Sequence, residues 1–164
     1  MTLLVGFLQS LINIPGVGRM CGIVGIYSHE MVATELYDSL IHLQHRGQDA
    51  CGILTGNDRF YLKHGLGLVR ESISSDDLLK LRGNMGIAHA RYPTAGGYSE
   101  ADIQPLWIGS PRGIALAHNG NLVNYAELAD DICKQHRHLN STLDSEALLL
   151  LLADNLANGF YNEN

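Results

Sequence analysis

The spacing of apolar residues in the first half of the chain predicts strands on either side of a helix. Residues 21–28 (CGIVGIYS) form a short apolar run with β-branched side chains, which is typical of a buried strand. Between residues 30 and 44 apolar side chains recur at helical spacing, at Val32, Leu36, Leu40 and Leu43, and predict one core-facing stripe. Two further strands are predicted over 51–56 and 59–69, with a Gly-Asn-Asp turn between them.

The second half of the chain predicts two strands, one loop and three helices. The loop is rich in small and turn-forming residues, so we expect it to be mobile. The last helix is apolar on several faces and should be well buried. In order, the segments are a helix over 74–83, a strand over 84–93, the loop over 94–105, a strand over 112–120, and helices over 124–136 and 144–156. This order predicts a mixed α+β fold.

Composition narrows the class of protein. The 164 residues are 46% hydrophobic and 17% charged, which predicts an ordered globular domain or a piece of a larger one. The net charge of −6 and the scattered basic residues argue against nucleic acid as a partner. The glycines form neither of the common nucleotide-binding loops, and the eight histidines lack metal-binding spacing. We therefore expect no metal and no cofactor in this segment.

Three cysteines without disulfide-like spacing favour a reducing compartment, so we expect a cytoplasmic protein. Residues 1–19 are apolar, but they lack a basic start and are interrupted by Gln9, Ser10 and Asn13. They fit neither a signal peptide nor a membrane-spanning helix. The chain stops a few residues after its last predicted helix, which suggests truncation at the C-terminus.

Cys21 is the first residue with candidate chemistry. A thiol becomes a good nucleophile only when a neighbouring group helps to form the thiolate. If Cys21 were the first residue, its own α-amine, with a pKa of about 7.7–8.0, could serve as the base. The alternative is a small core residue beside a strand, since free cysteine is among the most buried residue types. The spacing alone leaves both interpretations open.

Three other candidates have a functional and an ordinary interpretation: Arg91, the Asn119–Gly120 pair and Asp144. Arg91 at a strand end could bind a carboxylate or form a surface ion pair. Asn119 and Gly120 could supply two N–H donors to an oxyanion or form a simple turn. Asp144 could bind a cation or cap a helix. Arg46 lies in a tight HRGQD segment that could be a charge network holding a loop.

Taken together, the motifs resemble those of class II, or N-terminal-nucleophile, glutamine amidotransferases. The resemblance covers residues 20–164 and none of residues 1–19. Within the class it is greatest for the amidophosphoribosyltransferase branch, and the glucosamine-6-phosphate synthase branch is the nearest competitor. The motifs, in order, are MCGIVGI, LQHRGQDACGI, GNMGIAHARYPTAGG, GIALAHNGNLVNYAEL and NSTLDSEALL.

The resemblance implies an N-terminal-nucleophile (Ntn) hydrolase fold, a four-layer αββα sandwich of two sheets between helical layers. It implies that Cys21 is the nucleophile and that Asn119 and Gly120 form the oxyanion hole. It further implies that glutamine is the substrate. The resemblance assigns Arg91, Asp144 and Thr94 to substrate binding, and the loop after Arg91 to a lid. It assigns Arg46 to support of the strand that carries the nucleophile.

The resemblance also implies partners outside these residues. In the family, ammonia passes to a phosphoribosyltransferase domain and reacts with 5-phosphoribosyl diphosphate in purine synthesis. That domain is absent from residues 21–164, which we interpret as a partial glutaminase domain. Mg²⁺ is expected to bind together with the missing domain. The full-length protein is expected to be a homo-oligomer, specifically a tetramer. The sequence leaves an iron–sulfur cluster undecided. The fragment alone should be inactive or a glutaminase only.

Two features depart from the family pattern. Cys51 stands where a smaller residue is expected, and it fits a packed strand without a chemical role. Residues 1–20 precede the nucleophile, so Cys21 would have an amide nitrogen in place of the amine. Either Met20 is the true initiator or residues 1–20 are a propeptide, and a non-catalytic chain that retains the extension is a third possibility.

Overall fold

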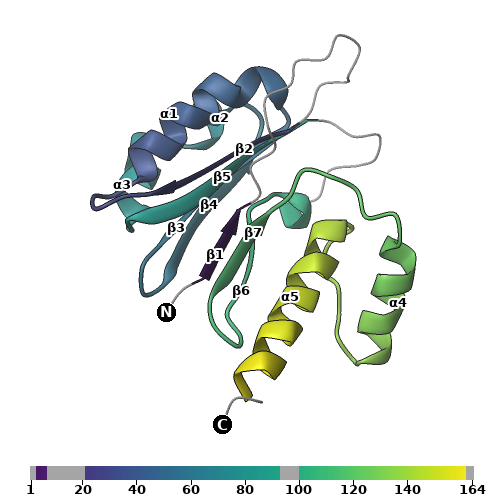
Figure 1. The fold of residues 1–164 in the computed structure, drawn as a ribbon. Coiled ribbons are helices and arrows are strands. Elements are labelled where there is room, and N and C mark those ends of the chain that lie inside the picture. Colours follow the sequence, from purple (N-terminus) through teal and green to yellow (C-terminus); the bar gives the residue numbers. More distant parts are fainter. Residues whose placement is uncertain (1–2, 7–20, 93–99, 162–164) are drawn as a thin grey trace.

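The computed structural model describes residues 3–6, 21–92 and 100–161. Two β-sheets lie face to face, with one group of helices on the outer side of each sheet (Figure 1). Helix α1 covers one outer face, and α5, flanked by α4, covers the other (Figure 1). The described residues therefore form the four-layer αββα sandwich that the resemblance implied.

The first sheet has four strands in the order β2-β5-β3-β4, and all neighbours are antiparallel. Its strands are β2 (Gly22–Tyr27), β5 (Met85–Arg91), β3 (Ala50–Gly56) and β4 (Phe60–Leu66). The helical segments between them are α1 (Ala33–Leu43), η1 (Gln44–Arg46), α2 (Val69–Ser72) and α3 (Ser75–Lys80).

The second sheet has three strands in the order β1-β7-β6. Strand β1 (Leu3–Gly6) runs parallel to β7 (Ile114–Ala117), and β6 (Leu106–Ile108) runs antiparallel to it. The short η2 (Glu100–Asp102) precedes β6. Helices α4 (Tyr125–Lys134) and α5 (Asp144–Tyr161) follow β7.

Alternation of side chains along the strands separates three apolar layers. On the outer face of the first sheet, Ile53 and Ala88 pack in one cluster with Leu36 and Leu40 of α1. These four side chains are fully buried, so the stripe predicted for this helix is confirmed at Leu36 and Leu40. The stripe is therefore what attaches α1 to the sheet.

Between the sheets, Leu54 and Ile87 of the first sheet contact Ala115 and Ala117 of β7. Small side chains on β7 face large ones across this layer, and this combination lets the two sheets approach closely. The opposite face of β7 carries larger side chains, which pack against α5. This third layer consists of Ile114, Leu116, Leu149 and Ala153.

The structure confirms most of the expected elements and moves some of their ends. The strand predicted over 59–69 stops at Leu66, because Gly67 adopts a positive φ of 89° and Val69 begins α2. The helix predicted to end at Gly83 stops at Lys80. Its expected serine cap is confirmed: the Ser74 hydroxyl accepts a hydrogen bond from the Asp77 N–H in a capping box.

Two strands and one buried segment were not predicted. Strands β1 and β6 have four and three residues, too few to show a period of two. The loop predicted over 94–105 contains a buried segment, since residues 102–104 are at most 6% exposed. Asp102 and Gln104 can be buried there because each side chain has hydrogen-bond partners. Residues 93–99 lie outside the described part of the chain.

Candidate functional site

Cys21 lies at the end of the first sheet, where β2 begins and β5 ends. Gly22 pairs with Ala90, so Cys21 comes opposite the end of β5 at Arg91. The Tyr92 backbone N–H donates to the Cys21 Sγ at 3.3 Å. The cysteine is half-buried, with part of its surface open to solvent. A backbone donor therefore holds the sulfur at an accessible sheet end, which differs from the fully buried role considered for it.

Asn119, just beyond the end of β7, links the second sheet to the nucleophile candidate. Its side-chain Nδ2 donates to the Cys21 carbonyl oxygen at 2.8 Å. Its Oδ1 lies 3.1 Å from the Nε2 of His89 on β5. Both ends of the amide are thus engaged, and one of the two N–H groups on Nδ2 has no acceptor among the described residues.

Gly120 follows Asn119 and packs closely on the preceding histidine. A Cβ at this position would lie 2.6 Å from the His118 Nε2. A side chain at this position would displace the His118 imidazole. Glycine therefore allows the imidazole to pack directly against the backbone of the turn. The Asn119–Gly120 pair therefore has structural reasons for its residue types, and these are compatible with a role as an oxyanion hole.

Arg91 is the last residue of β5. Its Nη1 donates to the Asp102 carbonyl oxygen at 3.1 Å. The Asp102 carboxylate in turn accepts from the Thr142 N–H at 3.0 Å. These bonds bring Arg91 to the segment that leads into α5, and they supply no surface ion pair for it among the described residues.

Asp144 is the first residue of α5. Its Oδ2 accepts from the Leu122 N–H at 2.6 Å, and its Oδ1 accepts from the Ser145 hydroxyl at 3.4 Å. The first of these bonds ties the helix to the turn that contains Asn119 and Gly120. The carboxylate thus stabilises contact between segments distant in the sequence, which goes beyond capping its own helix.

Gln104 connects the backbone at His118 with the start of α5, and this role was not predicted from the sequence. Its Oε1 accepts from the His118 N–H at 2.6 Å, and its Nε2 donates to the His118 carbonyl at 3.2 Å. The Nε2 also lies 3.3 Å from the Ser145 hydroxyl. One buried amide therefore supports both the backbone before Asn119 and the start of α5. In the sequence it is a polar residue in a loop, which gives no sign of burial.

His89 was also missed, although it lies in the motif that drew attention to Arg91. It is 1% exposed and faces the second sheet, on the same side of β5 as Ile87. Burial lowers the pKa of its imidazole to about 4; the hydrogen bond with Asn119 opposes this shift, while the charges of Arg91 and His118 add to it. The ring is therefore neutral at pH 7. The available signal was a polar residue at an inward position of an apolar strand.

Three other expectations concern residues near this site. Arg46 lies in η1, half-buried. The next residue, Gly47, packs on the end of β5, where a Cβ would lie 2.5 Å from the Ala90 carbonyl oxygen. This segment thus supports the strand next to that of Cys21. Thr94 and the expected lid lie in residues 93–99, outside the described residues.

The other cysteine in the first sheet has no visible chemical role. Cys51 is 1% exposed in β3, where its side chain belongs to the core beneath α1. Burial raises the pKa of its thiol to about 11, against smaller opposing effects of a hydrogen bond with Ser72 and the charge of Lys63. It therefore stays a neutral thiol, as expected for a packing residue.

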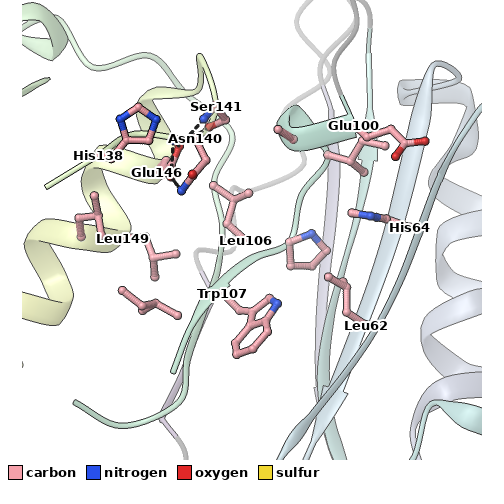
Figure 2. A pocket seen from close by; sticks show the side chains of 15 residues that line it. Leu62, His64, Glu100, Leu106, Trp107, His138, Asn140, Ser141, Glu146 and Leu149 are labelled. Carbon is pink, nitrogen blue, oxygen red and sulfur yellow. Dashed lines mark hydrogen bonds between the residues drawn. The ribbon is translucent and has the colours of Figure 1, made fainter. Parts of the chain in front are cut away.

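A cavity of about 320 Å³ lies away from these residues, between β4, β6 and α5. Figure 2 shows Leu62, Leu106 and Trp107 along its wall. Its best-placed carboxylate, that of Glu146, is already bonded to Asn140 and Ser141 (Figure 2). These three polar residues of the cavity wall are thus bonded to one another at the start of α5.

Neither metal-binding nor membrane-spanning features are found in the described part of the chain. No group of three or more His, Cys, Asp or Glu side chains in residues 3–6, 21–92 and 100–161 could hold a metal ion. Within the same residues, every helix is too short or too polar to cross a bilayer.

Comparison with known proteins shows that the sequence of this chain is similar to those of glutamine amidotransferases. Residues 89–163 match the glutamine amidotransferase domain family. The amidophosphoribosyltransferases of Pseudomonas aeruginosa and Escherichia coli are 51% and 49% identical to this chain over 140 and 142 residues. The chain is a homologue of the glutamine amidotransferase part of amidophosphoribosyltransferases. The alignments cover 84% and 85% of this chain, which spans 28% of the length of each relative.

Two solved structures of purine-related enzymes share the fold. The structure described as the allosteric regulatory enzyme of purine biosynthesis has a TM-score of 0.72 and 36% identity, covering 77% of this chain and 28% of its own. The glutamine phosphoribosylpyrophosphate amidotransferase of B. subtilis, complexed with ADP and GMP, has a TM-score of 0.69 with the same identity and coverage. The αββα sandwich is therefore the N-terminal-nucleophile fold, and the preference for this branch over the glucosamine-6-phosphate synthase branch is confirmed.

Proposed function

We propose that this chain releases ammonia from the side-chain amide of glutamine, with Cys21 as the nucleophile. The observation that carries the proposal is the contact of Asn119 with Cys21, at 2.8 Å between Nδ2 and the carbonyl oxygen. It brings the amide at the end of one sheet to the backbone of the cysteine at the end of the other. A nucleophile and an oxyanion donor must meet in this way for acyl transfer.

In the proposed reaction, the Cys21 thiol gives its proton to its own α-amine as Sγ attacks the side-chain carbonyl carbon of glutamine. The negative charge on the carbonyl oxygen is stabilised by the free N–H of the Asn119 amide and by the Gly120 backbone N–H. The α-ammonium then returns the proton to the leaving nitrogen, and the C–N bond breaks to release ammonia. Water hydrolyses the resulting thioester to glutamate and restores the thiol.

Recognition of glutamine needs one positive and one negative partner for its zwitterionic end. We assign Arg91 to the α-carboxylate and Asp144 to the α-ammonium, with Thr94 as a further substrate contact. The hydrogen bonds that Arg91 and Asp144 make with Asp102 and Leu122 support this assignment, because they orient both side chains before substrate arrives. Arg46 would act indirectly, through the packing of its segment on β5.

For the longer protein, we propose that the ammonia reacts with 5-phosphoribosyl diphosphate and gives 5-phosphoribosylamine, in the cytoplasm, as the first step of purine synthesis. The names of the relatives support this step. Mg²⁺ and the tetramer belong to the same proposal.

The proposal requires that the bond between Met20 and Cys21 is absent from the active protein. An amide nitrogen cannot accept the thiol proton, whereas a free α-amine can. Initiation at Met20 followed by methionine removal would expose Cys21, and so would cleavage of a propeptide. The competing possibility, a non-catalytic chain that retains residues 1–20, is favoured by one observation: residues 3–6 form strand β1 of the second sheet.

Two measurements on the complete protein test this function. N-terminal sequencing and intact mass should show Cys21 as the first residue of the active form. Cys21→Ala should abolish the glutamine-dependent reaction, because no nucleophile remains, and keep the reaction with free ammonia. The matched control is Cys51→Ala, which should retain both reactions. A first residue of Met1, or loss of both reactions in Cys21→Ala, would overturn the proposal.

A further inference from the structure

His89 is a buried polar side chain between two apolar sheet faces. It is 1% exposed, and its strand neighbours in register are Ile23 and Gly52. Its Nε2 lies 3.1 Å from the Asn119 Oδ1, and its buried Nδ1 has no partner among the described residues. An imidazole is costly to bury unless it is hydrogen-bonded. The contact with Asn119 offsets part of this cost, and the burial of His89 requires an explanation.

The orientation of Asn119 determines which ring nitrogen carries the proton. Because the Asn119 Nδ2 donates to the Cys21 carbonyl, the Oδ1 must be the atom that faces His89. An amide oxygen only accepts, so the His89 Nε2 must be the donor. The Nδ1 then carries a lone pair in place of a hydrogen, so it is an acceptor and has no N–H left to donate. The hydrogen is therefore on Nε2, and the lowered pKa of His89 agrees with a neutral ring.

We propose that His89 is a positioning residue for the oxyanion hole: its Nε2–H holds the Asn119 Oδ1, and this directs the Asn119 NH₂ group toward Cys21 and the reacting carbonyl. The catalytic part of this inference rests on the function proposed above. Without this bond the amide can rotate by half a turn and exchange its oxygen and nitrogen. An oxygen would then face the Cys21 carbonyl and the developing oxyanion, and both contacts would be repulsive.

The first test is structural and needs no activity. In the complete protein labelled with ¹⁵N at histidine and asparagine, NMR should show His89 as the neutral Nε2–H tautomer between pH 8 and pH 5. The Asn119 NH₂ protons should exchange slowly with water. His89→Leu, which removes the donor, should speed this exchange at least about tenfold. A hydrogen on Nδ1, or a charged ring at pH 7, would overturn the inference even if the protein hydrolyses glutamine.

The second test asks whether His89 acts through Asn119. His89→Leu should lower kcat for glutamine hydrolysis by roughly 10- to 100-fold, since loss of a whole oxyanion donor costs roughly 10²–10³ in kcat. The KM for glutamine and the ammonia-dependent rate should change less than about twofold. In an Asn119→Ala background, His89→Leu should have no further effect on kcat. An equal loss in both backgrounds would mean that the role of His89 is only structural.

The conservative variant separates positioning from folding. His89→Gln can present an N–H donor close to the place of Nε2, so it should recover kcat to within about fivefold of the unsubstituted protein. If His89→Leu does not fold, the tautomer of the unsubstituted protein and the kinetics of His89→Gln still decide the matter. If the unsubstituted protein hydrolyses no glutamine, the proposed function fails, and the NMR result alone decides how Asn119 is held.

Discussion

At the scale of single residues, the site depends on amides and a histidine that are nearly inaccessible to water. His89 and Gln104 are 1% and 6% exposed, and both contact the segment from His118 to Asn119. Hydrogen bonds in such surroundings are strong, and a missing partner there is costly. The orientation of Asn119, the proposed oxyanion donor, is therefore set by buried neighbours.

The low pKa of His89 makes folding stability depend on pH. In the unfolded chain the imidazole binds a proton below a pKa of about 6.5, whereas in the folded protein it does so only below about 4. Stability should therefore fall as the pH drops from about 6.5 to about 4, by about 3 kcal/mol for this group, and show no further loss from it at lower pH. Urea midpoints at pH 7 and pH 4.5 measure the change.

His89→Gln is the control for that measurement, because glutamine does not titrate. Its unfolding free energy should vary less between the two pH values than that of the unsubstituted protein, and the difference isolates the histidine from the carboxylates that also titrate. Equal pH dependence of the two proteins would show that His89 is as easily protonated in the folded state as in the unfolded state.

At the scale of elements, the start of α5 has an unusual cap. The Glu146 carboxylate accepts hydrogen bonds from the backbone N–H groups of Asn140 and Ser141, at 3.0 and 2.7 Å, and from both of their side chains. Burial raises the pKa of Glu146, but these hydrogen bonds outweigh it and lower the pKa overall. The carboxylate is charged at neutral pH and fixes the loop that leads to Asp144.

Removal of this cap should loosen α5. Glu146→Ala leaves the N–H groups of Asn140 and Ser141 without their partner, and we expect a loss of about 1–2 kcal/mol in unfolding free energy at pH 7. Because the folded pKa of Glu146 is lowered, the difference from the unsubstituted protein should shrink as acid protonates the carboxyl. Urea denaturation measures both effects. The exposed Glu127→Ala in α4 should change stability by less than about 0.5 kcal/mol, and an equal loss in the two variants would contradict this role.

Helices and strands with several regularly spaced apolar residues could be predicted from the sequence. Elements that exist only because a neighbouring strand pairs with them could not. Helix α1 and strand β5 follow from their side-chain spacing, whereas β6 is a strand only because β7 lies beside it. The site shows the same division. Cys21 and Arg91 stand at ends of predictable strands, but burial of Gln104 depends on the His118 backbone, which lies beyond any local pattern. Likewise, the sequence does not reveal that His89 faces Asn119.

At the scale of the whole molecule, the site spans both sheets. Cys21 belongs to the end of the first sheet and Asn119 to the end of the second, so their 2.8 Å contact depends on how the sheets are stacked. The layer between the sheets contains Ala115 and Ala117 facing Leu54 and Ile87. Small side chains in this layer therefore help to set the distance between Cys21 and Asn119, the proposed nucleophile and oxyanion donor.

A larger side chain in that layer should affect both stability and catalysis. Ala115 is fully buried, so Ala115→Leu should cost about 1–3 kcal/mol of unfolding free energy through overpacking. By separating the sheets it should also lower glutamine-dependent activity more than ammonia-dependent activity. Denaturant midpoints and the ratio of the two rates test this. The exposed Ala126→Leu in α4 is the matched control; an unchanged ratio in Ala115→Leu would show that sheet spacing does not affect the site.

Strand β1 connects the extension to this arrangement. It runs parallel to β7 with Gly6 beside Ala117, so its last residue lies at the sheet end from which Asn119 follows. While the chain is continuous, covalent linkage holds this strand in place at any protein concentration. Cutting the Met20–Cys21 bond would make it a separate peptide bound only by its own contacts. Its occupancy would then obey mass action, and dilution alone could empty that edge of the sheet.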